Sequence, residues 1–393
     1  LLGLAALNRL ALTDRLAGET PTAARRHMRV SIAMEMVLGL LVVITAGFLA
    51  SHTPGTHEQP VWPFPWRLDL GVFQEPGLRG EAIVALVAAA AAVAVASAGL
   101  IWRKVRWPAL IAAAIVLVLV VPRLGLLFVE AWPTTFYSSP TDFAVTSIVH
   151  GANLFAANCV VCHGPEGRGD GPAAKLLPVR PADLTAPHLL AHSEGDLFWF
   201  ISHGLDGPNG QAAMPAFSGM LSSEGIWALI DYLRAHHAGL TMQGGGPGGD
   251  AVPIPQFDAQ CADGTVVDRE ALRGTILHIV SMPEHAPPPP ALPSVEGVAV
   301  RTILLARHPP MPPIAGTCVT VEPEAWAAFA ILLGVTPDEL AGTELLGDTD
   351  QWLRAVWESA DAGKWNDPQQ AVAMIRDIAA HPLAPASEHA HHH

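Results

Sequence analysis

The chain has 393 residues, of which half are hydrophobic and 15% are charged, and its mean hydropathy is +0.33. This composition excludes a disordered protein and argues against a purely soluble one. The net charge is −14, divided into +3 over residues 1–130 and −17 over residues 131–393, which argues against a nucleic-acid-binding surface.

Three apolar segments are long enough to cross a bilayer, which takes about 20 helical residues. They are Val30–Ala50, Ala82–Trp102 and Ala109–Val129. An apolar stretch also opens the chain at Leu1, so we expect a partial fourth helix and a longer parent protein. None of these segments has the pattern of a cleaved signal peptide.

Basic residues predict the orientation of the three spans. Five arginines lie within residues 8–29 and three basic residues within 103–106, whereas no Lys or Arg occurs between Arg123 and Arg168. Because short basic loops stay in the cytoplasm, everything after Glu130 is expected to be exported. Tryptophans near the predicted span ends are typical of the membrane interface, and they are Trp62, Trp66, Trp102, Trp107 and Trp132.

Two motifs give the N-terminal segment a family resemblance, Leu-Asn-Arg-Leu-Ala-Leu-Thr at 7–13 and Arg-Val-Ser-Ile-Ala-Met-Glu-Met-Val-Leu-Gly-Leu at 29–40. On these motifs, residues 1–58 resemble the C-terminal part of the CopD family of copper-resistance membrane proteins. The resemblance implies copper handling across the inner membrane. His52 and His57 are candidate copper ligands, whereas the interpretation as solvated loop histidines is favoured.

The run Cys159-Val-Val-Cys162-His163 is the attachment pattern of c-type haem. Two thiols three residues apart on a helical turn can add to the two vinyl groups of one haem, and the adjacent histidine can reach the iron. A zinc site would need a second ligand pair nearby. A thioredoxin-type pair would need a preceding strand, whereas Ser147–Ala157 has the pattern of an amphipathic helix. The sequence therefore predicts one covalent haem c.

The residues around this motif, roughly 146–240, resemble class I cytochrome c domains. Gly151 and Phe155 match the first helix of that family, residues 223–236 match its last helix, and Met214-Pro215-Ala216-Phe217 matches the segment with the second iron ligand. The resemblance implies an all-α domain in which His163 and Met214 bind the iron. Such ligation serves one-electron transfer and leaves no position open for a substrate. Rival ligands without the Met-Pro context are His188, His192, His203 and Met220.

The C-terminal region has a regular order of expected elements. A hairpin around Asp263-Gly264 is followed by strands at 275–280 and 300–306, a helix at 324–333, a strand–turn–strand at 343–355 and a helix at 369–380. This order resembles an α/β thioredoxin-like domain of the Sco/redoxin type. The cysteines of that family would follow the first core strand, where this chain has Ser281-Met282-Pro283-Glu284-His285, so thiol–disulfide exchange there is excluded.

Several features of this region allow two interpretations. Met282 and His285 could bind Cu(I), or the domain could be a degenerate one kept for docking or stability. Cys261 and Cys318 are candidates for a structural disulfide in an exported domain. The terminal His389-Ala390-His391-His392-His393 could be a native metal-scavenging tail or the remnant of a purification tag.

Together these patterns predict a multidomain chain in five segments. We expect a transmembrane region at 1–130, a cytochrome c domain at 131–243, a Gly-rich linker at 244–252, a thioredoxin-like domain without catalytic cysteines at 253–380, and a His-rich tail at 381–393.

The predicted function is that of a mono-haem electron-transfer protein, not an enzyme in itself. It would lie in the inner membrane with its haem on the periplasmic side, and exchange electrons with a redox protein in respiration or copper handling. The alternatives are a copper transport or resistance protein with an accessory haem domain, and a copper-oxidase assembly factor.

Overall fold

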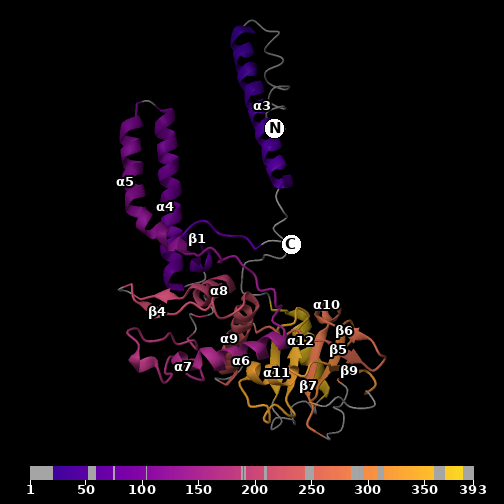
Figure 1. The fold of residues 1–393 in the computed structure, drawn as a ribbon. Helices are drawn as coiled ribbons and strands as arrows, with labels where there is room; N and C mark the ends of the chain where they lie inside the picture. Colours follow the sequence, from indigo (N-terminus) through magenta and orange to yellow (C-terminus); the bar gives the residue numbers. More distant parts are fainter. Residues whose placement is uncertain are drawn as a thin grey trace. The chain divides into compact units, whose positions relative to one another are not determined.

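The computed structural model describes residues 21–51, 59–73, 76–102, 104–186, 189, 192–207, 210–243, 252–284, 292, 295–307, 314–357 and 368–383. The chain divides into two compact units, Leu1–Pro60 and Val61–His393. The described part of the first unit is the helix α3, Pro21–Ser51, and residues 59–60. All other elements belong to the second unit (Figure 1).

Three helices are long and apolar enough to cross a membrane, as the sequence predicts. The candidate spans are Met28–Phe48 in α3, Gly77–Leu100 in α4 (Pro76–Ile101), and Arg106–Leu127, which contains α5 (Arg106–Leu124). Helix α4 begins six residues before the predicted span, because proline is favoured in the first turn of a helix.

The helices α4 and α5 form a hairpin (Figure 1). Its buried residues are mostly small, which allows the two backbones to approach closely in an apolar environment, and they include Ala82, Ala85, Ala92 and Ala113. Lys104 lies in the turn between the two helices. The opposite end of the hairpin continues into two short 3₁₀ turns, η2 (Gly71–Phe73) and η3 (Gly125–Leu127).

A two-stranded ribbon adjoins this end of the hairpin. The strands β1 (Trp66–Leu68) and β2 (Phe128–Glu130) pair antiparallel, with Trp66 opposite Glu130 and Leu68 opposite Phe128. Val72 of η2 and Leu127 of η3 bury their side chains with Ala82 of α4, so the two turns next to the ribbon pack on the hairpin.

The next segment is a helical domain with α6 (Val145–Asn158), α7 (Val160–His163), η4 (Ala174–Leu176), α8 (Glu194–His203) and α9 (Ser223–Gln243). The helices α6 and α9 cross at Gly151, where an added Cβ would overlap the carbonyl oxygen of Ala228. The apolar residues of α9 form a core with Phe155 and α8, and they include Ile226, Trp227, Leu229, Ile230 and Leu233.

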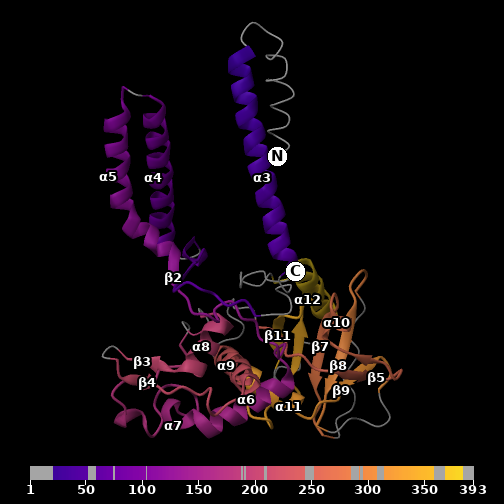
Figure 2. The same cartoon turned by 45° about the horizontal axis from the view of Figure 1, so that its top comes forward.

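The sequence predicted an all-α domain, and this detail is wrong. A short hairpin of β3 (Leu205–Asp206) and β4 (Ala212–Met214) follows α8 (Figure 2). Gly204, with φ +76°, ends α8 and lets the chain turn directly into β3. The last helix also extends seven residues past the predicted end, because its second half packs on the C-terminal domain.

The C-terminal domain is built on a seven-stranded sheet in the order β11-β10-β7-β8-β9-β5-β6. The strands are β5 (Ala259–Cys261), β6 (Val266–Val267), β7 (Ile276–Ser281), β8 (Val300–Leu305), β9 (Thr317–Thr320), β10 (Glu344–Gly347) and β11 (Leu353–Trp357). The central strands β7, β8 and β9 are parallel, and β10 and β11 add antiparallel to one side. The sequence did not predict β9, nor the short helix α10 (Arg269–Leu272).

Alternation along β7 gives the sheet two apolar faces. Leu277 and Ile279 pack with α11 (Ala325–Leu333), whereas Ile276 packs with α12 (Pro368–Ala380). The sheet thus has three parallel strands, an antiparallel pair beside them and a helix on each face. The predicted elements at 275–280, 300–306, 324–333 and 369–380 correspond to β7, β8, α11 and α12.

The helical domain and the sheet domain share one core. Val145, Ile148 and Ala235 belong to the same buried cluster as α11. Helices α6 and α9 lie beside α11 (Figure 1). The backbone N–H of Val145 donates to the carbonyl of Gln256 at 2.9 Å, and the N–H of Gln256 donates back to Phe143 at 3.1 Å. Most of the predicted linker, residues 244–251, lies outside the described residues.

Candidate functional site

The two cysteines of the attachment pattern lie on one tight turn. Cys159 ends α6 and precedes α7, and its carbonyl accepts the backbone N–H groups of Cys162 at 3.1 Å and His163 at 2.8 Å. Both cysteines are free and half-buried. The turn therefore places two thiols and an imidazole next to one another.

Burial raises the pKa of the Cys159 thiol to about 11, and the neighbouring Cys162 adds to the effect. Both causes oppose the thiolate form. A thiol–disulfide exchange site needs the opposite, a lowered cysteine pKa. Burial at this turn therefore disfavours the thiolate of Cys159, which a redox-active dithiol would need.

The imidazole of His163 is fixed by a backbone acceptor. Its Nδ1 lies 3.0 Å from the carbonyl oxygen of Ala182, and because a carbonyl only accepts, Nδ1 must carry the proton. Burial lowers the pKa of His163, which favours the neutral ring. A neutral imidazole with Nδ1 protonated leaves Nε2 free to bind a metal.

The glycine-rich loop after His163 folds back onto this turn. Gly169 donates its N–H to the carbonyl of His163 at 2.8 Å, and Gly171 donates to Cys162 at 3.1 Å. A Cβ at Gly171 would lie 2.6 Å from the carbonyl oxygens of Val160 and Val161, so only glycine fits there. The loop satisfies the last carbonyls of α7 and leads the chain to Ala182.

Met214, the other predicted ligand, lies at the end of β4, where it pairs with Leu205 of β3. Its half-buried side chain packs against the same apolar cluster as Cys159 and Val160. The structure thus brings the attachment turn and Met214 to one apolar core. An apolar group such as haem would find a nitrogen ligand in His163 and a sulfur ligand in Met214 beside this core.

The rival ligands have other environments. The ring of His203 stacks on Trp199 at 3.6 Å, and its Nδ1 lies 3.3 Å from the Trp199 carbonyl. His192 lies edge-on to Phe200 at 5.2 Å. Met220 is 66% exposed, in contrast to the half-buried Met214. His188 lies outside the described residues.

The candidate copper ligands are largely beyond what the structure describes. His52, His57 and His285 lie outside the described residues. Met282 follows β7 and packs against an apolar cluster that includes Val280. Among the described residues, no group of three or more His, Cys, Asp or Glu side chains is placed to hold a metal ion.

Cys261 and Cys318 form a disulfide bond between the paired strands β5 and β9. This pairing places the bond inside the core of the C-terminal domain. Both cysteines are 5% exposed or less.

Two features of the site have no signal in the sequence. One is the Ala182 carbonyl, because a backbone acceptor can belong to any residue type. The other is Asp231, which is buried on α9 and accepts hydrogen bonds from Thr141 at 2.5 Å and Ser147 at 2.6 Å. A lone acidic residue on a helix usually faces solvent, so nothing in the sequence marks the Asp231 side chain as buried.

Comparisons with known proteins address the helical domain. Residues 146–233 match the family model described as cytochrome C oxidase, cbb3-type, subunit III. Cytochrome c550 of Pseudomonas aeruginosa is 32% identical over 106 residues, which are 26% of this chain and 66% of that protein. Cytochrome c6 of Picosynechococcus sp. is 30% identical over 25% of this chain and 81% of its own length. Cytochrome c6 of Anabaena variabilis is 35% identical over 22% of this chain and 86% of its own length.

Solved structures give weaker likenesses. A reducing HAO-like protein complex of Kuenenia stuttgartiensis is 29% identical, over 22% of this chain and 42% of that one, with a TM-score of 0.20. BsSco, a Sco-family cytochrome c oxidase assembly protein, is 13% identical over 31% and 94% of the chains, with a TM-score of 0.22. A thioredoxin family protein of Chlorobium tepidum is 17% identical over the same shares, with the same TM-score. The fold of the C-terminal domain is therefore identified from the order and direction of its strands.

Proposed function

The chain belongs to the c-type cytochromes, and from this premise we propose that it is a membrane-anchored cytochrome that transfers single electrons between redox proteins. The observation that carries the proposal is the turn 159–163, on which two half-buried thiols adjoin an imidazole that the Ala182 carbonyl holds through Nδ1. The matched domain implies covalent haem c.

Each site residue has a defined part in this proposal. Cys159 and Cys162 would attach the haem, and Nε2 of His163 would bind its iron. The sulfur of Met214 would be the second ligand. The haem supplies an Fe(III)/Fe(II) couple, and His/Met ligation leaves no position open for a substrate. The Ala182 carbonyl holds the imidazole in one tautomer and orientation throughout.

The membrane helices set where this chemistry takes place. The basic turn at Lys104 would lie in the cytoplasm, so the opposite end of the α4–α5 hairpin and the domains beyond Glu130 would lie in the periplasm. Tethering keeps the haem at a high effective concentration near membrane-bound partners. The segment boundaries predicted from sequence, 1–130, 131–243 and 253–380, belong to this proposal.

In the same proposal the C-terminal domain supports the cytochrome domain and carries out no thiol chemistry. Ser281 and Met282 stand where the thioredoxin-like resemblance would place cysteines, and Cys261 and Cys318 are joined in the core. Copper handling remains a prediction from the resemblance of residues 1–58 to CopD proteins. These residues lie outside the family match at 146–233.

The proposal is tested by expressing the chain with a haem-ligation system and measuring its haem content by pyridine haemochrome. We expect one haem per chain and a reversible one-electron potentiometric titration. The variant Cys159→Ser/Cys162→Ser should lose covalent attachment, while Cys261→Ser/Cys318→Ser should keep it. A colourless wild-type chain would overturn the proposal.

A further inference from the structure

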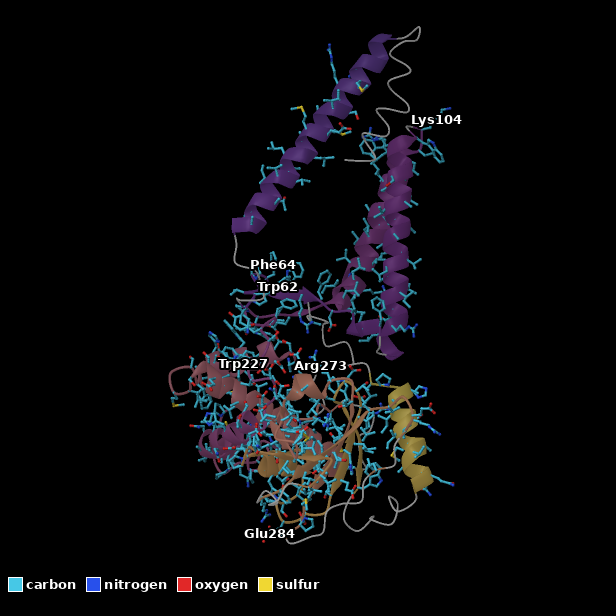
Figure 3. All side chains as sticks on the ribbon, turned by 90° about the vertical axis from the view of Figure 1, so that its right-hand side faces the viewer. Trp62, Phe64, Lys104, Trp227, Arg273 and Glu284 are labelled. Carbon is cyan, nitrogen blue, oxygen red and sulfur yellow. A yellow bond between two sulfur atoms is a disulfide. The ribbon has the colours of Figure 1, made fainter. Side chains whose placement is uncertain are left out.

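A row of exposed aromatic rings follows the β1–β2 ribbon. The ring centroids of Trp62 and Phe64 are 5.5 Å apart, those of Phe64 and Trp66 are 5.5 Å apart, and those of Trp66 and Phe128 are 5.2 Å apart. Figure 3 shows Trp62 and Phe64 next to each other. Phe64, Trp66 and Phe128 are 46–50% exposed. Contiguous apolar surface of this kind marks an interaction site.

The ribbon has one apolar face and one buried face. Its alternation puts Trp66, Leu68 and Phe128 on the exposed side, and Leu68 is 53% exposed. Arg67 points to the other side and is 7% exposed. The only charged residue of the two strands on the exposed face is Glu130. This face is therefore suited to the boundary between an apolar phase and water. It has no basic residue that would select an anionic ligand.

The position of the ribbon along the chain identifies that boundary. The apolar span Arg106–Leu127 ends one residue before Phe128, and α4 begins eight residues after Leu68. The ribbon is thus continuous with two membrane spans, at the end of their hairpin away from Lys104. Aromatic side chains at this depth are favoured among lipid headgroups.

Resting on the membrane anchoring in the proposed function, we propose that the exposed face of the β1–β2 ribbon is a lipid-binding platform. It lies in the headgroup layer of the periplasmic leaflet and holds the cytochrome domain at a fixed tilt to the membrane. The ligand is the phospholipid interface itself, without a requirement for anionic lipid.

The ribbon can fix this tilt because hydrogen bonds join it to the cytochrome domain. The N–H of Trp62 donates to the carbonyl of Pro133 at 2.8 Å. The hydroxyl of Thr134 donates to the carbonyl of Gly195 at 2.6 Å, and that of Thr135 donates to the Asp196 carboxylate at 2.5 Å. These bonds fasten the segment after β2 to the first turn of α8.

Packing reinforces the same connection. The rings of Trp132 and Phe200 meet edge to face at 4.7 Å, and a Cβ at Gly195 would overlap the carbonyl oxygen of Thr134. Helix α8 leads directly into the hairpin with Met214. A continuous series of contacts therefore connects the exposed rings of the ribbon, through α8, with the hairpin that carries Met214.

The depth of the platform is measured with a fluorescent thiol label on the haem-loaded full chain in phosphatidylcholine nanodiscs. Cys159 and Cys162 are occupied by haem and Cys261 and Cys318 by each other, so Phe64→Cys offers a single reactive thiol. We expect lipids with a nitroxide quencher to remove most of its emission, relative to discs without quencher. Val266→Cys, at a 62% exposed position of the C-terminal domain, should keep its emission.

A second labelled variant separates the platform from the anchor. Met36→Cys, at a 71% exposed position within the α3 span, should be quenched as well. If the label at position 36 is quenched and the label at position 64 is not, the platform is overturned and the anchoring stands. If neither is quenched, the membrane anchoring in the proposed function fails.

The fixed tilt is tested by electron paramagnetic resonance of oriented membrane multilayers. The ferric haem signal of the wild type should depend on the angle between membrane and field. Phe64→Ser/Trp66→Ser/Phe128→Ser should lose most of this dependence, while its haem content and absorption spectrum are unchanged. Val266→Ser is the matched control. An unchanged angular dependence in the triple variant would overturn the orienting role.

Discussion

At the scale of single residues, the chemistry of this site depends on backbone atoms as much as on side chains. The Cys-Val-Val-Cys-His pattern in the sequence identified the attachment turn and its imidazole. It did not reveal that the Ala182 carbonyl orients His163, or that a carbonyl-lined pocket excludes any side chain at Gly171. Such partners come from distant chain segments brought together only by folding.

The proposed sulfur ligand gives a spectroscopic prediction. Met214→Ala should abolish the weak sulfur-to-iron absorption band of the oxidised protein, because no other thioether is placed against the same apolar cluster in the described part of the chain. The midpoint potential should fall, since thioether ligation raises it. Met220→Ala is the control and should keep both properties. A band that persists in Met214→Ala would remove this residue from the site.

The buried carboxyl of Asp231 predicts a pH dependence of stability. Burial raises its pKa from 3.8 to about 6, against the lowering effect of the Ser147 and Thr141 hydroxyls. The folded state therefore prefers the protonated carboxyl, and this contribution to stability is present below pH 3.8 and lost as the pH rises through 6. Two pKa units correspond to about 3 kcal/mol at most.

The variant Asp231→Asn tests this effect, because the amide oxygen can still accept the two hydroxyl bonds. Guanidinium unfolding of the haem-loaded protein, followed by haem absorption at pH 4 and pH 8, should show a smaller loss of stability in the variant than in the wild type. Equal losses in the two proteins would show that Asp231 does not titrate in this range.

At the scale of elements, the crossing of α6 and α9 depends on one glycine. Gly151→Ala should lower the free energy of unfolding by about 1–3 kcal/mol, because the new methyl group overlaps the Ala228 backbone and forces the helices apart. The matched control is Gly219→Ala, where nothing lies within 4 Å of the added Cβ. Chemical denaturation measures both. Equal stabilities would mean that the crossing adapts without cost.

The elements also differ in how well the sequence predicts them. Strands such as β7 and β8 and helices such as α11 have long apolar runs, and the structure has them within about two residues of the predicted bounds. Strand β9 has four residues and gives no periodic signal. The β3–β4 hairpin depends on turns at Gly204 and Gly210, whose positive φ angles cannot be distinguished from those of ordinary loop glycines in a sequence.

At the scale of the whole molecule, charge asymmetry predicts the orientation of the chain. Alkaline phosphatase fused after Leu383 should be active, because the acidic domains beyond Glu130 are expected in the periplasm. The same reporter inserted at Lys104, in the basic turn between α4 and α5, should be inactive. The opposite pattern of activities would place the haem in the cytoplasm and contradict the proposed orientation.

The sequence does not predict how its domains meet. Composition divides residues 131–380 at a glycine-rich stretch, which suggests two domains joined by a flexible linker. Instead, Val145, Ile148 and Ala235 of the helical domain are buried in the cluster of the sheet domain. From the sequence, these apolar side chains could pack within the helical domain or against the sheet domain. Only the folded structure shows which domain covers them.

This shared core has a practical consequence for anyone who wishes to isolate the haem protein. Truncation after Gln243 would uncover those three side chains, together with the surface around Gly239 that rests on the carbonyl of Ile331. Such a shortened polypeptide would expose an apolar surface on its haem domain and would self-associate. A useful soluble preparation should therefore begin beyond the spans and run through residue 383.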